Sequence, residues 1–202
     1  LPLSQDARKR MTLDGLWQFK FEGDGDWRSI SVPSVWQSEF ADLRDAFGTA
    51  SYRRQFFLPQ EWAERDISLH FGAVNYFAEV LVNGQPIGNH EGGYLPFSLT
   101  IPNSILKPEN EIEVSVTLPS ADATRYPQFP FAEIPHGKQS WYGPLGGIWQ
   151  SVTLEARDTS HIKHAEVRAD LSSGAVRFDL DLSASAADAE VRVAVYGPDG
   201  AL

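Results

Sequence analysis

The chain has 202 residues, of which 42% are hydrophobic and 22% are charged, as in ordinary globular proteins, and its formal net charge at pH 7 is -10. This negative charge opposes binding to a phosphate backbone, and no apolar run is long enough to cross a bilayer, so we expect no nucleic-acid partner and no membrane partner. The absence of cysteine excludes disulfides and leaves the compartment open between cytoplasmic and secreted or periplasmic.

The first part of the chain predicts short strands separated by turns. From Trp17 to Phe21, apolar and polar residues alternate, which is the period of a strand with one buried face. The stretch from Ile30 to Trp36 is apolar but contains Pro33, so we expect an edge strand or a strand end there. Residues Phe40 to Ala50 have few β-branched side chains and predict a connecting loop.

That loop carries the first candidate site residue. Asp42, Arg44 and Asp45 are either ligand contacts or a solvated face, and a solvated face is the commoner role of charged loop residues. We keep Asp45 as a candidate substrate-binding residue.

The middle of the chain contains a clear hairpin signal. Asn83-Gly84 lies between apolar alternations, and both residues tolerate the positive φ that a type I′ turn requires. His70 falls on the outward face of its strand. The expected strands in this region run from Tyr52 to Leu58, Ile67 to Phe71, Tyr76 to Val82, Gln85 to Gly88, Tyr94 to Ile101 and Ile112 to Leu118.

A long irregular segment separates Pro119 from Gly147. Its prolines and large aromatic side chains favour an ordered surface loop over a disordered one. Two interpretations of Trp141 and Tyr142 remain open. They either pack over the end of the fold as apolar plugs, or they form the wall of a pocket to which Lys138 and Gln139 contribute polar groups.

The strand pattern predicts an all-β protein with two domains. No helix-period segment of useful length occurs, so residues 1–157 are expected to form a jelly-roll β-sandwich. From residue 158 the strands become regular and poor in aromatic residues. Three of them are expected, and three strands leave a bare edge and an uncovered apolar face. We therefore expect residues 158–202 to be a truncated sandwich domain whose strands either pair with another chain, for example in a homo-oligomer, or are poorly ordered. The three strands run from His161 to Asp170, Ala175 to Leu182 and Ala189 to Tyr196.

No residue of the chain is marked as catalytic. Glycoside hydrolysis needs two carboxylates flanking the scissile bond, and no acidic residue is marked as a member of such a pair. Asn110-Glu111 matches a familiar acid/base dipeptide, but it lies in a turn that leads into an alternating strand, which is the simpler explanation. His161 and His164 face opposite sides of a strand, so we expect no metal site and no cofactor.

Several short motifs follow one another along the chain: Leu13-Asp14-Gly15-x-Trp17-x-Phe19, Val32-Pro33-Ser34-x-Trp36, Tyr52-Arg53-Arg54, Asn75-Tyr76, Val82-Asn83-Gly84, Gly92-Gly93-Tyr94-x-Pro96-Phe97, Glu109-Asn110 and Gly146-Gly147-Ile148-Trp149. Taken in this order, they strongly resemble the N-terminal domain of glycoside hydrolase family 2, which includes β-galactosidases, β-glucuronidases and β-mannosidases. The resemblance covers nearly all of residues 11–155, and residues 158–202 are similar to the start of the family's immunoglobulin-like domain.

This resemblance implies a galactose-binding-like jelly roll, part of an immunoglobulin-like sandwich, and a (β/α)8 barrel, outside this sequence, that carries both catalytic glutamates. In the family, the jelly-roll loops border the active-site pocket of the barrel. The chain would then be a non-catalytic N-terminal fragment of a retaining β-glycosidase, which binds carbohydrate through the complete enzyme and has its own C-terminal barrel as a partner. The alternative is a self-sufficient carbohydrate-binding module or lectin.

The sequence also departs from the family pattern. β-Galactosidases and β-glucuronidases place a sugar-contacting Asp before the Gly-Ile motif, and an ungapped match puts Trp141 at that position. Lys138, Gln139, Trp141 and Tyr142 are the local substrate-binding candidates. Residues 40–48 are most similar to β-glucuronidases, whereas residues 32–37 are more similar to β-galactosidases, so the motifs do not identify the sugar.

Overall fold

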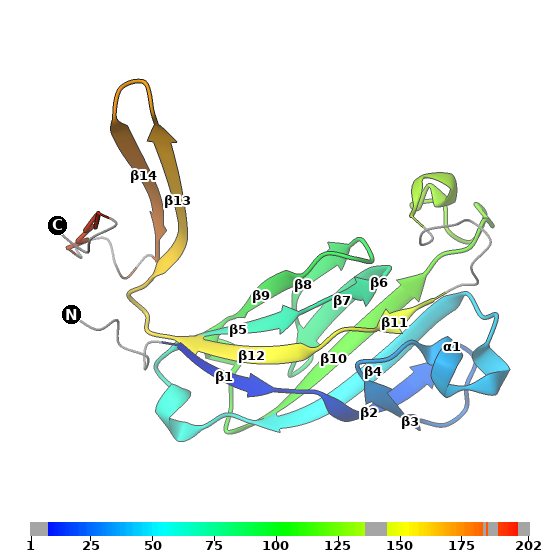
Figure 1. Ribbon diagram of the computed structural model, residues 1–202. Coiled ribbons are helices and arrows are strands. Elements are labelled where there is room, and N and C mark those ends of the chain that lie inside the picture. The colour runs from blue at the N-terminus through cyan, green and yellow to red at the C-terminus, as the bar shows by residue number, and fades with distance from the viewer. Residues whose placement is uncertain (1–7, 136–144, 184, 186–189, 198–202) are drawn as a thin grey trace. The chain divides into compact units, whose positions relative to one another are not determined.

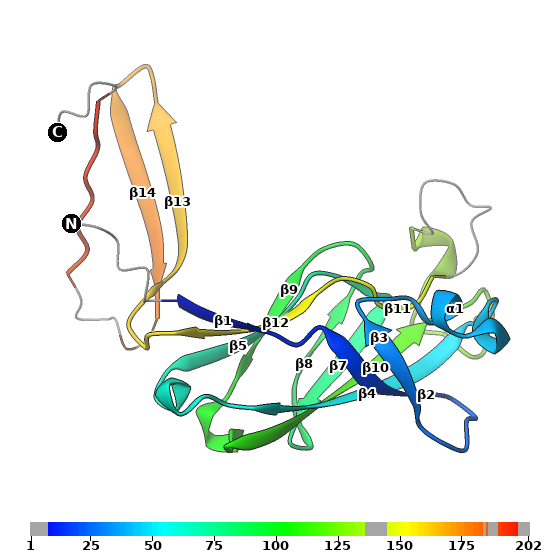
Figure 2. The ribbon, with the colours of Figure 1, turned by 60° about the horizontal axis from the view of Figure 1, so that its bottom comes forward.

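The computed structural model describes residues 8–135, 145–183, 185 and 190–197. The chain divides into two units, Leu1–Ala156 and Arg157–Leu202. Figure 1 shows that the first unit is built from two layers of strands, and Figure 2 shows the same layers from another side.

The larger layer of the first unit is a six-stranded sheet in which the pairings with recorded register are antiparallel. Its central strand, β10, pairs with β4 on one side and with β7 on the other. In spatial order the strands are β3 (Arg28–Val32), β2 (Gly15–Phe21), β4 (Gly48–Phe57), β10 (Glu109–Leu118), β7 (Phe77–Val82) and β8 (Gln85–Glu91).

The smaller layer has four strands, and a short two-stranded sheet lies near one end of the unit. The four strands are, in spatial order, β1 (Arg8–Thr12), β12 (Val152–Arg157), β5 (Asp66–Phe71) and β9 (Phe97–Ile101). The short sheet pairs β11 (Gly147–Ile148) with β6 (Val74–Asn75).

One apolar core joins the two layers. In β10 the buried residues alternate with half-buried ones, and Ile112, Val114 and Val116 all point inward. In β5 of the opposite layer, Ile67 and Leu69 are fully buried in the same cluster. This two-residue period is what lets each sheet bury one face, because side chains alternate across a strand. The predicted all-β sandwich is therefore confirmed.

Helical structure in the described residues is limited to short segments. The strand expected from Ile30 to Trp36 ends at Val32, because Pro33 has no N–H to donate to the ladder. Trp36 instead begins the short helix α1 (Trp36–Glu39) with a fully buried indole.

The loop that the sequence predicts from Phe40 to Ala50 is longer than the observed one, because β4 already starts at Gly48. Four 3-10 helices complete the set: Ala41–Leu43, Gln60–Trp62, Asn103–Ile105 and Phe131–Glu133.

The predicted hairpin is confirmed. Strands β7 and β8 pair across Asn83-Gly84, where φ is 52° for Asn83 and 75° for Gly84. The Asn83 side chain also bonds at a distance, since its Nδ2 donates to the carbonyl of Ile105 at 2.7 Å. The turn thus fixes both the hairpin and the connection after β9.

Where the structure describes the second unit, it contains one hairpin, formed by β13 (Ile162–Asp170) and β14 (Ala175–Leu182). These two strands match their predicted positions. The third predicted strand is wrong for residues 190–197, which adopt no regular secondary structure. A strand needs a neighbour for its backbone hydrogen bonds, and apolar alternation alone does not provide one.

Asn110, which the sequence offers as half of an acid/base dipeptide, has a structural role. Its side chain is 2% exposed, and its Oδ1 accepts from the Lys107 N–H and from Asn83 Nδ2, each at 2.9 Å. Its Nδ2 donates to the Lys107 carbonyl at 2.6 Å. Asn110 therefore closes the turn before β10.

We predict that Asn110→Ala lowers the free energy of unfolding by about 2–3 kcal/mol, because it removes the three hydrogen bonds that the buried Asn110 side chain forms with Lys107 and Asn83. Urea denaturation measures this change. The control is Gln85→Ala, an exposed side chain, which should change stability by less than about 0.5 kcal/mol. Equal stability of the two variants would contradict the structural role.

Candidate functional site

The candidate site is the end of the first unit where β4 begins and β10 finishes, called here the rim. Figure 1 shows α1, β6 and β11 at this end, together with the segment that follows β10. The segments that meet there are residues 33–47, 74–76, 91–96, 119–135 and 145–149. Loops at one end of a sandwich are a common place for ligand-binding groups, because a rigid scaffold holds them.

The returning end of the long loop is held by α1. The Trp36 N–H donates to the Gly146 carbonyl at 3.1 Å, and the Gly146 N–H donates to Gln37 Oε1 at 2.9 Å. Gln37 Nε2 in turn donates to the Ala46 carbonyl at 3.1 Å. A Cβ on Gly146 would collide with the indole of Trp36, so only glycine allows this close approach.

Asn75 also holds the returning end of the long loop. Its Nδ2 donates to the carbonyl of Leu145, while its backbone pairs with Gly147 in the β6–β11 sheet. Its Oδ1 is buried and has no hydrogen-bond partner within the residues the structure describes. Gly93 lies so close to this oxygen that a Cβ would overlap it. Asn75 therefore anchors the base of the loop through its Nδ2, while its Oδ1 is enclosed beneath Gly93.

The outgoing half of the long loop is ordered by its own side chains. Asp122 Oδ1 accepts from the Thr124 N–H at 3.0 Å, and Arg125 forms an ion pair with Glu22. Phe129 is buried and packs edge-on against the ring of Tyr76 at 5.8 Å. The predicted ordered, aromatic-lined loop is thus observed for residues 119–135.

Aromatic and apolar side chains form the exposed part of the rim. The Trp149 indole N–H donates to the Gly93 carbonyl at 2.8 Å, and its ring meets that of Tyr94 with the centroids 6.0 Å apart. Tyr94 is 47% exposed and Leu145 is 53% exposed, next to Leu95 at 71%. Large exposed apolar groups gathered at one end suit contact with a ligand or with another domain.

Tyr76 adds a hydroxyl that stays protonated. Burial and the hydrogen bond from its hydroxyl to Glu91 Oε1, at 2.8 Å, raise the pKa of Tyr76 to about 12. Both effects disfavour the phenolate, burial through desolvation and Glu91 through repulsion of a second negative charge. Tyr76 is therefore a donor and a structural contact at neutral pH rather than a base.

Of the residues predicted to bind substrate, Lys138, Gln139, Trp141 and Tyr142 lie outside the described residues. Asp45 is exposed and lies in the turn that follows Ala41–Leu43. The sequence did not mark Gln37 or Asn75 as site residues. Both lie in motifs quoted for the resemblance or directly beside them, and Asn75 interrupts an otherwise apolar run, which is a weak signal for a buried polar role.

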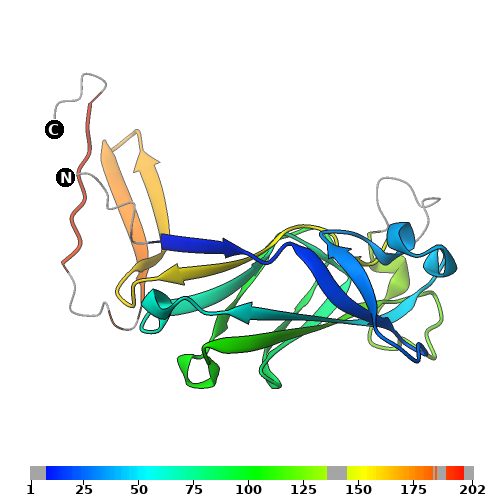
Figure 3. The ribbon, with the colours of Figure 1, turned by 90° about the horizontal axis from the view of Figure 1, so that it is seen from below.

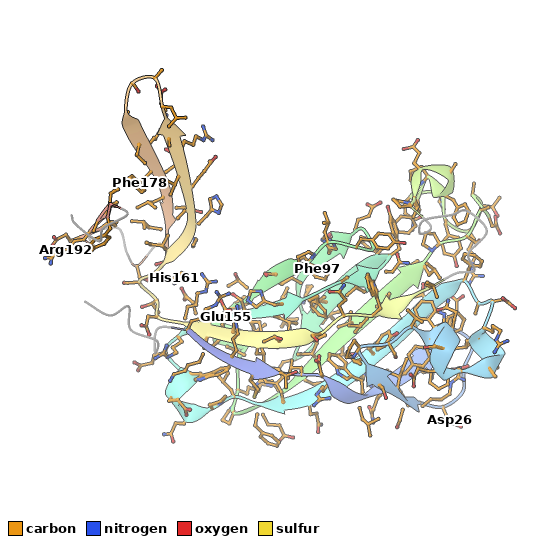
Figure 4. All side chains as sticks on the ribbon, viewed as in Figure 1. Asp26, Phe97, Glu155, His161, Phe178 and Arg192 are labelled. Carbon is orange, nitrogen blue, oxygen red and sulfur yellow. The ribbon has the colours of Figure 1, made fainter. Side chains whose placement is uncertain are left out.

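A second polar cluster lies in the four-stranded layer. Glu155 is 1% exposed, and it accepts from Nε of Arg8 and from Nε of Arg10, the latter at 2.9 Å. Both arginines belong to β1, and Glu155, which Figure 4 labels, belongs to β12, so these ion pairs tie one strand to its neighbour. Glu155 has a structural role in these contacts.

The described part of the rim can bind and orient a polar ligand. It offers a hydroxyl at Tyr94 and the exposed apolar surfaces of Tyr94, Leu95 and Leu145. No group of three or more His, Cys, Asp or Glu within the described ranges is placed to hold a metal ion. In the same ranges, no helix has the length and apolar character of a membrane span.

A two-layer β-sandwich with polar and aromatic loops at one end is the architecture of a jelly-roll domain, a class in which such loops often carry the binding groups. Comparison with known sequences identifies the family: the model for "Glycosyl hydrolases family 2, sugar binding domain" matches residues 10–156. The chain belongs to glycosyl hydrolase family 2, through its sugar-binding domain.

The chain is similar to several longer curated proteins of this family. A putative β-glucuronidase of Formosa agariphila is 29% identical over 147 residues, covering 71% of this chain and 17% of the relative. A β-glucuronidase of Paenibacillus borealis is 26% identical and covers 96% of this chain and 37% of the relative. A β-galactosidase of Thermoanaerobacter pseudethanolicus is 27% identical over 154 residues, covering 75% of this chain and 20% of the relative. The chain thus spans well under half the length of these relatives.

Solved structures give the same result. A β-glucuronidase of an uncultured Clostridium species superposes with a TM-score of 0.71 at 25% identity, covering 92% of this chain and 35% of that one. A β-glucuronidase from Ruminococcus gnavus in complex with D-glucuronic acid has a TM-score of 0.70 at 25% identity, covering 90% of this chain and 36% of that one.

We predict that Gly146→Ala lowers the free energy of unfolding by about 1–3 kcal/mol, because the added methyl group overpacks the contact with Trp36. The near-ultraviolet circular dichroism of the indole should weaken together with the thermal midpoint. Gly25→Ala is the matched control, since its methyl group would meet no atom within 4 Å. A Gly146→Ala variant as stable as this control would refute the close packing.

The raised pKa of Tyr76 gives a pH prediction. The stabilisation is fully present below pH 10, the usual pKa of tyrosine, and is lost as the pH rises towards about 12, because the unfolded chain releases the phenol proton first. Tyr76→Phe should therefore make the loss of stability between pH 10 and 12 less steep, by up to about 1.4 kcal/mol per pH unit. Urea denaturation at several pH values measures the slope. An unchanged slope would contradict the assignment.

Proposed function

We propose that this chain is the N-terminal, non-catalytic part of a retaining β-glycoside hydrolase, and that its rim borders the active-site pocket of a (β/α)8 barrel encoded beyond it. The observation that carries the proposal is the rim itself. A long loop is fixed at both ends, by the Glu22–Arg125 ion pair and by the Gly146 contacts, on a domain of this family. The family match supports the reaction class, namely hydrolysis of an O-glycosidic bond.

The relatives suggest what to test first as a substrate. Those quoted above are named β-glucuronidases and β-galactosidases, and the Ruminococcus gnavus structure holds D-glucuronic acid. We infer that the complete protein acts on a β-linked glycoside, with β-D-glucuronides as the first candidates. The rim would then contribute to recognition of the sugar, while the acid/base and the nucleophile come from the barrel.

The rim groups have defined parts in this arrangement. Asn75 anchors the base of the loop through its Nδ2, and the exposed ring of Tyr94 with the exposed side chains of Leu95 and Leu145 provides apolar surface for a sugar face or for the barrel. Lys138, Gln139, Trp141 and Tyr142 remain our candidates for direct contact with the sugar, together with Asp45.

We predict that the complete protein releases nitrophenol from a 4-nitrophenyl β-glycoside in a panel of glucuronide, galactoside and mannoside, whereas the 202-residue chain releases none above the buffer rate. Hydrolysis by the 202-residue chain would overturn the assignment of the catalytic pair to another domain. A complete protein without activity on any β-glycoside would overturn the reaction class.

A self-sufficient carbohydrate-binding module is the second candidate, and the closed core of the first unit favours it. It requires saturable sugar binding by the isolated chain that Trp141→Ala abolishes. The main proposal requires instead that Trp141→Ala lower kcat/KM of the complete protein by about tenfold or more, the value of one lost contact in the transition state. Undiminished activity would indicate that the domain only braces the barrel.

A further inference from the structure

Strands β2 and β4 pair along only part of their length. The ladder runs from Gln18 opposite Arg53 to Phe21 opposite Ala50. Before Gln18, β2 pairs with β3 alone, and after Arg53, β4 pairs with β10 alone. The two strands therefore part on one side of the Gln18–Arg53 pair. Figure 3 shows the reason, since the chain of β1 and β2 passes from beside β12 in one layer to beside β4 in the other.

A cleft of about 410 Å³ lies where the strands part. This volume is within the range of small-ligand sites. Polar side chains from four neighbouring strands line it: Gln18, Ser29, Arg53, Arg54, Gln55 and Glu111. The buried ring of Trp17 also borders the cleft.

Two arginines are held in place at the cleft. Arg54 Nη1 donates to the Leu16 carbonyl at 2.9 Å, and its guanidinium lies 6.0 Å from the centre of the Trp17 ring. Within the described residues Arg54 forms no ion pair with a carboxylate. Arg53 pairs with Glu113 at 3.0 Å and stacks over Trp27. Their orientation is thus fixed before any ligand arrives, which lowers the entropy lost on binding.

The remaining groups complete a set of donors and acceptors. Gln18, Gln55 and Ser29 are exposed, and each can both donate and accept a hydrogen bond. The Glu111 carboxylate can only accept, and the guanidinium of Arg54 can only donate. The adjacent hydroxyl groups of a sugar ring, each a donor and an acceptor, fit such a mixture.

The charge of the cleft selects among polar ligands. Arg53, Arg54, Glu111 and Glu113 sum to zero at neutral pH, within a chain of net charge -10. A phosphate or an acidic sugar would meet the field of Glu111 as well as that of Arg54, whereas a neutral ligand meets no net repulsion. We propose that this cleft is a second carbohydrate site, which binds a neutral pyranose unit of an oligosaccharide.

The site is separate from the rim. Gly48 of β4 pairs with Leu118 at the rim end, while Gln55 pairs with Glu111 near the other end of the same ladder. At about 3.3 Å per residue, the two lie roughly 20 Å apart along the strand. The inference therefore goes beyond the proposed role of the rim. A carbohydrate site in this cleft would hold the complete enzyme on a polysaccharide while the active site acts elsewhere.

The test uses the 202-residue chain in affinity electrophoresis through gels that contain β-1,4-galactan, β-1,4-mannan, arabinoxylan or, as the acidic comparison, carboxymethylcellulose. We expect at least one neutral polysaccharide to retard the chain. The double variant Gln18→Ala/Gln55→Ala should weaken this retardation by about tenfold or more, because two hydrogen-bonding amides are lost. Both glutamines are exposed, so the variant should fold normally, which far-ultraviolet circular dichroism checks.

Two controls separate this site from the rim. Gln60→Ala removes an exposed glutamine outside the cleft and should leave the retardation unchanged, as should Trp141→Ala. The proposal is overturned if no neutral polysaccharide retards the chain, if only carboxymethylcellulose does, or if retardation survives the double variant. Loss of retardation in Trp141→Ala alone would also overturn it and would support binding at the rim. None of these outcomes bears on the catalytic activity of the complete protein.

Discussion

The close packing of Gly146 on Trp36 is the constraint on which the rim depends. A glycine is needed because the indole occupies the space of a Cβ, and this approach places the Gly146 backbone within reach of Trp36 and Gln37. The returning end of the long loop continues into Gly147, which pairs with Asn75 in the short β6–β11 sheet. The contact between Gly146, which has no side chain, and Trp36 thus brings together a strand end, a short helix and a long loop.

The two halves of the loop are held in place by different kinds of contact. The half near Asp122 is stabilised by its own turn, by Phe129 in the core and by the ion pair with Glu22, so it holds its shape through local bonds and burial. The returning half depends on distant partners. A loop held by such contacts loses less conformational entropy when a substrate binds than a free loop would lose. This property suits the wall of an active site.

The two carbohydrate sites proposed for the domain rest on different features of the sandwich. The rim is built from loops, whose sequences vary without disturbing the sheets. The cleft exists because the chain changes layers between β1 and β2, so that the residues of β2 before Gln18 lie away from β4. One feature follows from the length of a loop and the other from strand topology, so each can change without the other.

The sequence was informative where the physical cause is local. Asn83-Gly84 predicted its hairpin because positive φ is a property of the turn residues themselves, and Pro33 predicted a strand end because it lacks an N–H. It failed at residues 190–197, where apolar alternation was present but no neighbouring strand was. The sequence also failed to mark Gln37 as a site residue. The reason is that its Oε1 accepts a hydrogen bond from the Gly146 N–H, which lies 109 residues away in the chain.

By itself, the sequence determined the all-β class, the periods of the strands, most of the turns and, through its motifs, the family. The tertiary structure decided which strands are neighbours, where β2 leaves β4, and which polar side chains meet at the rim. The physical reason is the range of the interactions. Alternation and turn chemistry act over a few residues, whereas the partners of Asn75, Arg54 and Gly146 are chosen by the packing of two sheets around a common core.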